Sequence, residues 1–254
     1  MVIDTHAHYD DKRFEGDLDR IMRDMKAQGM IAVNASIDRK SWEDTIRLIE
    51  TYEPLYGMLG IYPEYVADYG DQDLDKIREL AAHERIVAIG EIGLDYHYEN
   101  HPDKELQMEW FRKQISLAKE LHLPINVHSR DAAEDTLNVI RSENAAACGG
   151  IIHCFSSSPE IALEYVKLGF YLGIGGVVTF SNAKKLKEVV KAVPIENIVL
   201  ETDCPYLAPM PHRGERNSSL YLPLVIEEIA GLKDMTVDEV EQITEKNARE
   251  VYRL

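Results

Sequence analysis

The sequence predicts a single (β/α)8 TIM barrel that spans residues 1–254. Eight short runs rich in β-branched and other apolar residues recur along the chain. Amphipathic stretches with apolar residues at helical spacing lie between these runs. No Ser/Gly/Pro-rich linker, internal repeat or low-complexity tract interrupts the alternation, and the chain length suits one barrel of about 250 residues.

Each apolar run is short enough for a strand, and each amphipathic stretch is long enough for a helix that packs on the outside of the barrel. The eight predicted strands occupy, in chain order, residues 2–8, 30–36, 55–63, 85–95, 123–130, 149–157, 170–179 and 197–205. The predicted helices between them include residues 16–28, 40–52, 71–80, 106–122, 159–169 and 183–193. The last segments, 220–233 and 236–254, are predicted to be closing helices, with Thr236 as the N-cap of the second.

The charge and hydropathy of the chain restrict its partners. The formal net charge of -17 excludes a protein that coats long nucleic acid through a basic surface, because such binding needs cations that release counterions from phosphates. It leaves open a nuclease with a locally positive site. No stretch approaches the roughly 18 consecutive apolar residues of a membrane span, and no signal peptide precedes the first strand. We therefore expect a cytoplasmic protein with no membrane partner and no obligate protein partner.

Metal-competent side chains stand at the carboxyl ends of five predicted strands. In a barrel of this class, chemistry gathers at these ends because the loops that follow the strands form one shared rim. In the first strand, His6 and His8 face the same way, roughly 6.5 Å apart along the backbone. The fourth strand ends with Glu91 and Asp95, the fifth with His128, the sixth with His153 and the eighth with Asp203.

These strand ends together predict a metal centre. A single histidine or aspartate of this kind is more often a hydrogen-bonded core residue or a loop cap. Four imidazoles and two carboxylates in one rim are enough for two divalent ions with open positions for water and substrate. The sequence does not decide the identity of the metal, which could be zinc, manganese or magnesium. The predicted ligands are His6, His8, Glu91, His128, His153 and Asp203.

The order and spacing of several motifs resemble one known family. The series "DTHAH", "GEIGLD", "LPINVHSRDA", "HCFSSS", "LGIGG" and "LETDCPYLAPMPHRGERN" is similar to the TatD family of metal-dependent deoxyribonucleases, within the amidohydrolase-like TIM-barrel superfamily. The resemblance covers essentially the whole chain, down to the closing "NAREVYRL". It implies the same six metal ligands, with Glu91 as the bridge between two ions.

One position departs from the family pattern. Members of the family commonly carry Gly-x-His-Pro at the end of the third strand, whereas this chain reads "GIYPEY" with Tyr62 at the histidine position. The resemblance implies that the missing histidine contacts substrate or phosphate rather than metal. Tyr62 can still donate one hydrogen bond to a phosphate oxygen, but it cannot become cationic near neutral pH.

Basic side chains follow two of the ligand-bearing strands. Arg130 lies just after His128, and the loop after the eighth strand carries His212, Arg213 and Arg216. We expect these residues to surround the metals and to bind phosphate oxygens through forked guanidinium contacts. The alternative for each arginine is a salt bridge that shapes its loop.

The predicted reaction is hydrolysis of a DNA phosphodiester by a metal-activated water, with Asp203 as proton acceptor and Glu91 as bridging ligand. The resemblance supplies DNA as the substrate, and a recessed site in an acidic protein favours exonuclease-like cleavage of single-stranded or frayed ends. Two alternatives stay open. The same site could serve an amidohydrolase, an esterase or an aminoacyl-RNA deacylase. Alternatively, the metals could only stabilise the barrel of a noncatalytic binding scaffold.

Overall fold

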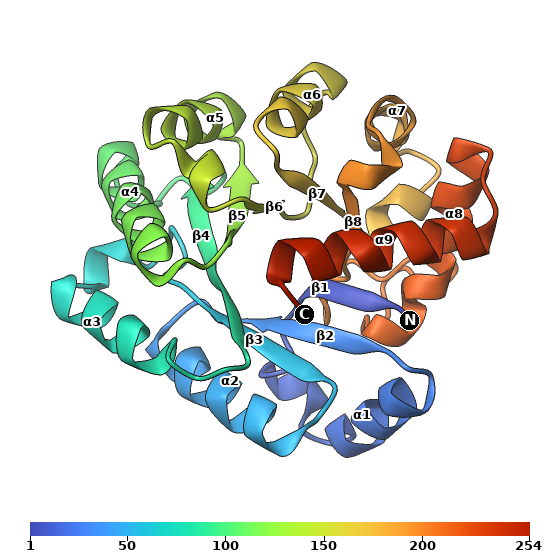
Figure 1. Cartoon of the computed structure of the whole chain (residues 1–254), viewed down its shortest axis with the longest axis horizontal. Helices are drawn as coiled ribbons and strands as arrows, with labels where there is room; N and C mark the ends of the chain where they lie inside the picture. The colour runs from blue at the N-terminus through green and yellow to red at the C-terminus, as the bar shows by residue number, and fades with distance from the viewer.

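The computed structural model describes residues 1–254, the whole chain, and shows eight parallel strands in one sheet with the order β1 to β8. Every strand pairs with the next strand along the chain, and helices surround the sheet on its outer side (Figure 1). The predicted (β/α)8 TIM barrel is therefore confirmed.

The strands are short, and most of their residues are buried, as expected when helices cover one face and the barrel interior covers the other. Their bounds are β1 (Ile3–Ala7), β2 (Ile31–Ala35), β3 (Leu55–Leu59), β4 (Ile86–Asp95), β5 (Ile125–Arg130), β6 (Gly150–Ile152), β7 (Tyr171–Ile174) and β8 (Ile198–Leu200).

Nine α-helices follow the amphipathic pattern, and each of the first eight lies on the outside of the barrel. Their bounds are α1 (Leu18–Ala27), α2 (Arg39–Thr51), α3 (Asp71–Leu80), α4 (Lys104–Leu121), α5 (Ala133–Ser142), α6 (Pro159–Lys167), α7 (Lys184–Ala192), α8 (Leu222–Lys233) and α9 (Val237–Tyr252). Six short 3-10 helices occupy connections, among them η4 (Gly176–Thr179) between β7 and α7.

The predicted strand 170–179 is too long. β7 ends at Ile174, and the following residues form η4. Gly176 explains the change of direction, because a side chain there would collide with the backbone carbonyl of Leu207 in the loop after β8. The close approach of two backbones, rather than strand packing, therefore accounts for this glycine.

The barrel closes between its first and last strands. The side-chain hydroxyl of Thr5 donates to the carbonyl of Leu200 at 2.9 Å, and the backbone N–H of Asp203 donates to the carbonyl of His6 at 2.9 Å. A parallel bridge joins Ala7 to the segment after β8. These contacts hold the ends of β1 and β8 together, where three predicted metal ligands stand.

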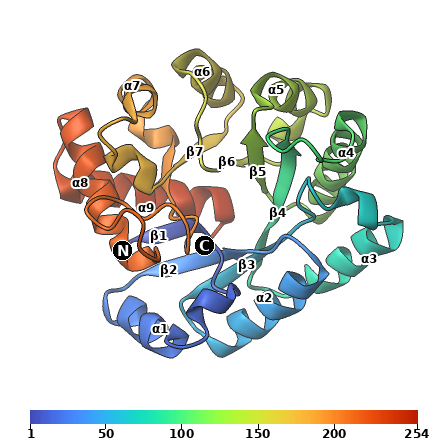
Figure 2. The same ribbon diagram turned by 180° about the vertical axis from the view of Figure 1, so that it is seen from behind.

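α9 closes the amino-terminal end of the barrel. Thr236 caps this helix as predicted, since its hydroxyl accepts the N–H of Glu239 at 3.2 Å while the glutamate accepts the N–H of Thr236 at 2.8 Å. Val251 and Tyr252 pack against residues at the starts of the strands. Figure 1 shows α9 crossing the barrel beside β1, and Figure 2 shows the barrel from behind. The opposite end, at the carboxyl ends of the strands, is left for a site.

No helix of the structure is both long enough and apolar enough to cross a membrane.

Gly93 holds β4 against β5 and provides a test of the barrel packing. Its φ of 141° is a backbone conformation that residues with a side chain rarely adopt, and a Cβ there would collide with the carbonyl of His128. We expect Gly93→Ala to lower the free energy of unfolding by about 3 kcal/mol, because both strain and collision oppose the added methyl group. Denaturant titration would measure this change. Gly16→Ala is the control, because a Cβ at Gly16 has no neighbour within 4 Å; equal stability of the two variants would contradict the prediction.

Candidate metal centre

The six predicted ligands converge at the carboxyl ends of the strands. They lie in or directly after β1, within β4 and β5, directly after β6, and three residues after β8. His6, Glu91 and His153 are buried, whereas the other three side chains are partly exposed. The centre is therefore partly accessible to solvent through His8, His128 and Asp203. The converging residues are His6, His8, Glu91, His128, His153 and Asp203.

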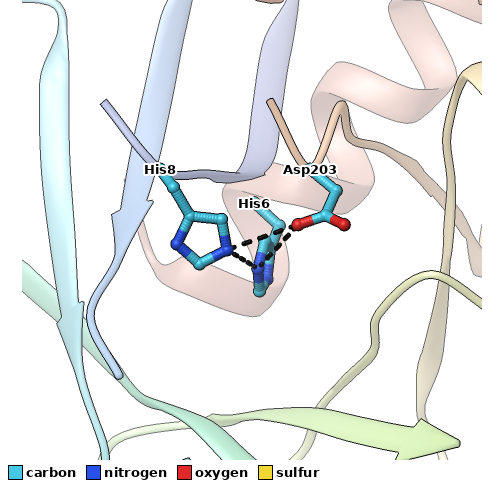
Figure 3. A group of neighbouring side chains, drawn as sticks. All are labelled: His6, His8 and Asp203. Carbon is cyan, nitrogen blue, oxygen red and sulfur yellow. Dashed lines mark hydrogen bonds and ion pairs between the residues drawn. The ribbon is translucent and has the colours of Figure 1, made fainter. Parts of the chain in front are cut away.

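The first group of ligand atoms comes from β1 and the loop after β8 (Figure 3). The Nε2 atoms of His6 and His8 are 3.1 Å apart. Asp203 Oδ1 lies 3.7 Å from His6 Nε2 and 3.3 Å from His8 Nε2. Glu91 Oε2 completes the group at 3.5 Å from His6 Nε2 and 3.7 Å from His8 Nε2.

The second group uses the other oxygen of Glu91. Glu91 Oε1 lies 2.8 Å from His128 Nδ1 and 2.9 Å from His153 Nε2. The two histidine nitrogens are 3.1 Å apart. The two carboxylate oxygens of Glu91 therefore face two different clusters of nitrogen atoms, which is the arrangement of a bridging carboxylate.

The residues fit a pair of divalent ions. Four ligands placed about 2.1 Å from a tetrahedral Zn²⁺ are separated by about 3.4 Å. In the first group, the five interatomic distances given above lie between 3.1 and 3.7 Å. The second group offers three donors at 2.8–3.1 Å from one another and leaves room for ligands other than protein.

Hydrogen bonds fix three of the four imidazoles with the ligating nitrogen free. The Nδ1–H of His6 donates to Asn126 Oδ1 at 2.9 Å, and that of His8 donates to the carbonyl of Ala35 at 2.8 Å. In His128 the roles are reversed, since Nε2–H donates to Asp95 Oδ2 at 3.0 Å and Nδ1 faces Glu91. Such partners orient metal-ligating histidines and raise their basicity.

The support of His6 reaches across the barrel. Asn126 on β5 accepts from His6 and donates through Nδ2 to the hydroxyl of Tyr252 at 3.0 Å. Tyr252 in turn donates to the carbonyl of Thr5 at 2.8 Å. The helix that closes the far end of the barrel therefore helps to orient a ligand of the metal centre.

The ligand carboxylates carry negative charge at neutral pH. Burial opposes ionisation of Glu91, but the neighbouring His153 and His128 hold its pKa well below the ordinary value. Burial also opposes ionisation of Asp203, and the hydrogen bond with His8 lowers the pKa of that carboxyl below its ordinary value. Ionised carboxylates are the form that binds cations.

Asp4 secures the loop that carries Asp203. Its carboxylate accepts the N–H of Thr202 at 3.0 Å and the hydroxyls of Thr202 and Ser219 at 2.6 Å each. The N–H of His6 is a fourth donor to this carboxylate. Burial still raises the pKa of Asp4 to about 6. The side chain thus ties β1 to the loop after β8 and fixes Asp203 opposite the two histidines.

Of the predicted substrate contacts, Arg130 and Arg213 keep their guanidinium groups free of acidic partners. Arg130 at the end of β5 donates to the hydroxyl of Tyr98 at 3.3 Å. Arg213 lies over the ring of Phe180, 4.4 Å from its centre. Their contact with substrate stays a prediction.

His212 has an acidic partner in its own loop, and Arg216 has one in the segment before α1. His212 pairs with Glu215 at 2.9 Å and stacks on the ring of Tyr221. Arg216 makes a two-pronged ion pair with Asp17, with both nitrogen–oxygen distances at 2.7 Å. This ion pair is the kind of contact given above as the alternative for each arginine, and contact of Arg216 with substrate stays a prediction.

Tyr62 is placed beside the centre, and its hydroxyl contacts Asp95 and His128. It donates to Asp95 Oδ2 at 2.8 Å and lies 3.1 Å from His128 Nε2. Burial opposes ionisation of Asp95, but the hydrogen bond from His128 lowers its pKa to about 2. Tyr62 therefore helps to orient Asp95 and, through it, His128, and its contact with substrate stays a prediction.

This contact gives a prediction for Tyr62→Phe. We expect the variant to bind metal about tenfold more weakly, because loss of the hydroxyl loosens the partner that orients His128. Competition with a metal-sensitive dye would measure the affinity. Tyr65→Phe is the control, since Tyr65 packs against Tyr62 without a hydrogen bond from its hydroxyl; equal metal affinity in both variants would contradict the orienting role.

Sequence reasoning missed Asn126, and it named Asp95 without giving it a role. Alternation within β5 was the available signal, because Asn126 stands two residues before His128 and shares its face. Glu201 was missed in the same way, two residues before Asp203. Its Oε1 accepts the N–H of Cys154 at 2.6 Å, whereas its buried Oε2 has no hydrogen-bond partner.

Comparison with known proteins identifies the family of the chain. The family model described as TatD related DNase matches residues 3–253. The chain is 46% identical to the uncharacterized metal-dependent hydrolase YabD of Bacillus subtilis over the full length of both proteins. It is 35% identical to the uncharacterized metal-dependent hydrolase YcfH of Escherichia coli, covering 100% of this chain and 96% of that one. The crystal structure of YjjV, a TatD homolog from Escherichia coli, superposes with a TM-score of 0.93 at 28% identity, covering 100% and 98% of the two chains. The chain belongs to the TatD family and is a metal-dependent hydrolase.

Proposed function

We propose that this protein is a deoxyribonuclease that hydrolyses the phosphodiester bonds of DNA. One observation carries the proposal: Glu91 presents its two oxygens to two groups of ligand nitrogens, with Oε2 toward His6 and Oε1 toward His128. Paired divalent ions suit in-line displacement at phosphorus, because they stabilise both the attacking and the leaving oxygen. The family to which the chain belongs supports DNA as the substrate.

Four histidines and two carboxylates would hold the ions, which supply Lewis acidity toward water and phosphate oxygens when bound. Asp203 is the proton acceptor for the attacking water, since it is ionised and 20% of its side chain remains accessible to solvent. Glu91, only 4% exposed, stays a ligand and takes no proton. The guanidinium of Arg130 would orient a non-bridging phosphate oxygen through paired donors.

The charge of the chain favours strand ends as substrate. A net charge of -17 repels long duplex from most of the surface. Cationic side chains without an ion pair that could form a local positive region are Arg130, two residues after the ligand His128, Arg213 on the loop after β8, and Lys185, which lines a cavity together with Asp203. A single strand or frayed end reaches such a local positive region more readily than a duplex does, so we infer exonuclease-like action.

The test is hydrolysis of single-stranded DNA labelled at its 5′ or 3′ end. Protein reconstituted with zinc, manganese or magnesium is expected to shorten one labelled strand stepwise, and chelated protein is expected to leave it intact. The direction of shortening gives the polarity. Intact DNA with every metal would overturn the proposal, whereas the metal content of the same samples would show whether the centre had been loaded.

One observation favours a second candidate, a metal-dependent esterase or aminoacyl-RNA deacylase. Tyr62 gives its hydroxyl to Asp95 and supplies no positive charge where the family commonly has a histidine. A carboxylic ester needs less positive charge than a phosphodiester. Turnover of a carboxylic ester by metal-loaded protein that leaves DNA intact would favour this candidate.

A further inference from the structure

A cavity of about 210 Å³ adjoins the metal centre at Asp203. It lies between the segment after β6, the β7–α7 connection and the loop after β8. Its walls are largely apolar and are formed by Phe155, Val177, Leu186 and Leu207. Asp203 is thus shared by the cavity and the group of metal ligands, so a molecule bound at the centre can extend directly into the cavity.

Glycines keep this space open. Gly173 and Gly175 line the cavity, and a side chain at Gly173 would collide with Oε2 of Glu201. Glu201 also lines the cavity, it is 1% exposed, and its Oε2 has no hydrogen-bond partner. A buried carboxyl oxygen without a partner is costly unless a ligand or a water supplies a donor.

The size and lining of the cavity select its occupant. A volume of about 210 Å³ is smaller than the cavities that hold drug-sized ligands and suits one flat group of roughly ten atoms. Apolar walls suit the faces of an aromatic ring, and the polar atoms of Glu201 and of Asn182 at the rim suit its edge. A ring with apolar faces and hydrogen-bonding edges describes a nucleobase.

A neighbouring cavity fits this occupant less well. It shares Phe155, Ser156 and Lys185 with the first, but the hydroxyls of Ser129 and Ser157, the carboxylate of Asp131 and the imidazole of His153 line only this one. Such a surface suits water or the sugar–phosphate backbone rather than the faces of a base. Transfer of a base from water therefore costs less free energy in the apolar cavity than in this neighbouring one.

We propose that the cavity between Val177 and Leu207 binds the heterocyclic base of a nucleotide that flanks the scissile phosphate. This inference rests on the proposed nuclease function and adds a determinant of substrate choice. A phosphodiester at the centre has one nucleoside on each side, and the position of Asp203 directs one of them into the cavity. The base then anchors the phosphate next to the ligands, so a substrate without that base is bound in many unproductive orientations.

The test uses a deoxydinucleoside monophosphate, which has one phosphodiester bond, and two analogues that each lack one base. With metal-loaded protein, we expect one analogue to be hydrolysed with a kcat/KM at least tenfold below that of the complete dinucleotide, and the other within about threefold of it. Val177→Trp fills the cavity, so it should lower kcat/KM for the complete dinucleotide at least tenfold and change hydrolysis of the sensitive analogue less than twofold.

Two further variants keep the result interpretable. Leu207→Trp narrows the same cavity from an exposed loop position and should reproduce the effect even where Val177→Trp does not fold. Val237→Trp, at an exposed position that begins α9, is the control and should behave as the native protein.

The outcomes separate the two proposals. Equal hydrolysis of all three substrates, or equal loss on all of them in both cavity variants, would overturn the base-binding cavity and leave the nuclease function intact. Absence of hydrolysis of every substrate and of longer single-stranded DNA would overturn the nuclease function, and the base-binding cavity with it.

Discussion

Replacement of Glu91 by glutamine is expected to reduce bound metal to no more than about one ion per chain and to slow hydrolysis by about 10³-fold. The two carboxylate oxygens of Glu91 face different groups, with Oε2 toward His6 and Oε1 toward His128 and His153. An amide keeps the shape of the side chain, but only its carbonyl oxygen can donate an electron pair to a metal, because the lone pair of the NH2 group is delocalised. Only one of the two groups therefore retains its ligand. The change also removes the negative charge that offsets two adjacent cations.

Metal analysis by mass spectrometry after removal of free ions, together with steady-state rates, would measure both effects. Glu188→Gln is the control, because Glu188 is an exposed carboxylate on α7 outside the centre. It should retain the native metal content and rate. Native metal content in Glu91→Gln would contradict the bridging role, even where the rate falls.

Replacement of Asp203 by asparagine is expected to lower kcat by about 10³-fold with little loss of stability. Asparagine fits the position, because Asp203 has a φ of 54° and asparagine adopts this left-handed conformation readily. The loop also keeps its anchor, since Asp4 binds Thr202 and Ser219 rather than the side chain of Asp203. What the variant loses is the ionised group that accepts the proton of water and completes the first group of ligands.

Rates on single-stranded DNA, circular dichroism and denaturant titration would separate loss of function from loss of fold. Asp234→Asn is the matched control, since Asp234 also has a φ of 54° but is an exposed residue at the carboxyl end of α8, outside the centre. A kcat for Asp203→Asn within tenfold of the native value would contradict its role as proton acceptor. An unfolded variant would show that the residue acts mainly on structure.

The strands and the ligands could be predicted from the sequence for the same reason. Parallel strands that are buried on both faces read as apolar runs, and an ionisable residue at the end of such a run is conspicuous against them. His6 and His128 stand near the ends of β1 and β5, whereas Glu91 lies within β4, four residues before its end at Asp95. The three-residue strands β6 and β8 still carried enough of the pattern to place His153 and Asp203 near their ends.

The sequence says less about the predicted substrate contacts, because their surroundings depend on side chains from other segments of the chain. Arg216 and Tyr62 have the chemistry to bind a phosphate, but the first pairs with Asp17 and the second donates to Asp95. Both partners are distant in sequence from the residue they bind. Periodicity carries no information about which side chains of separate loops meet.

By itself, the sequence determined the barrel, the rim on which its chemistry gathers and the identities of the residues that could hold metal, because these follow from local periodicity and from position at strand ends. Only the tertiary structure decided which atoms of Glu91 face which histidines, that Asn126 and Asp95 orient the imidazoles, and that an apolar cavity opens beside Asp203. These features depend on angstrom-scale distances between side chains from different strands and loops, which are set when the whole barrel packs.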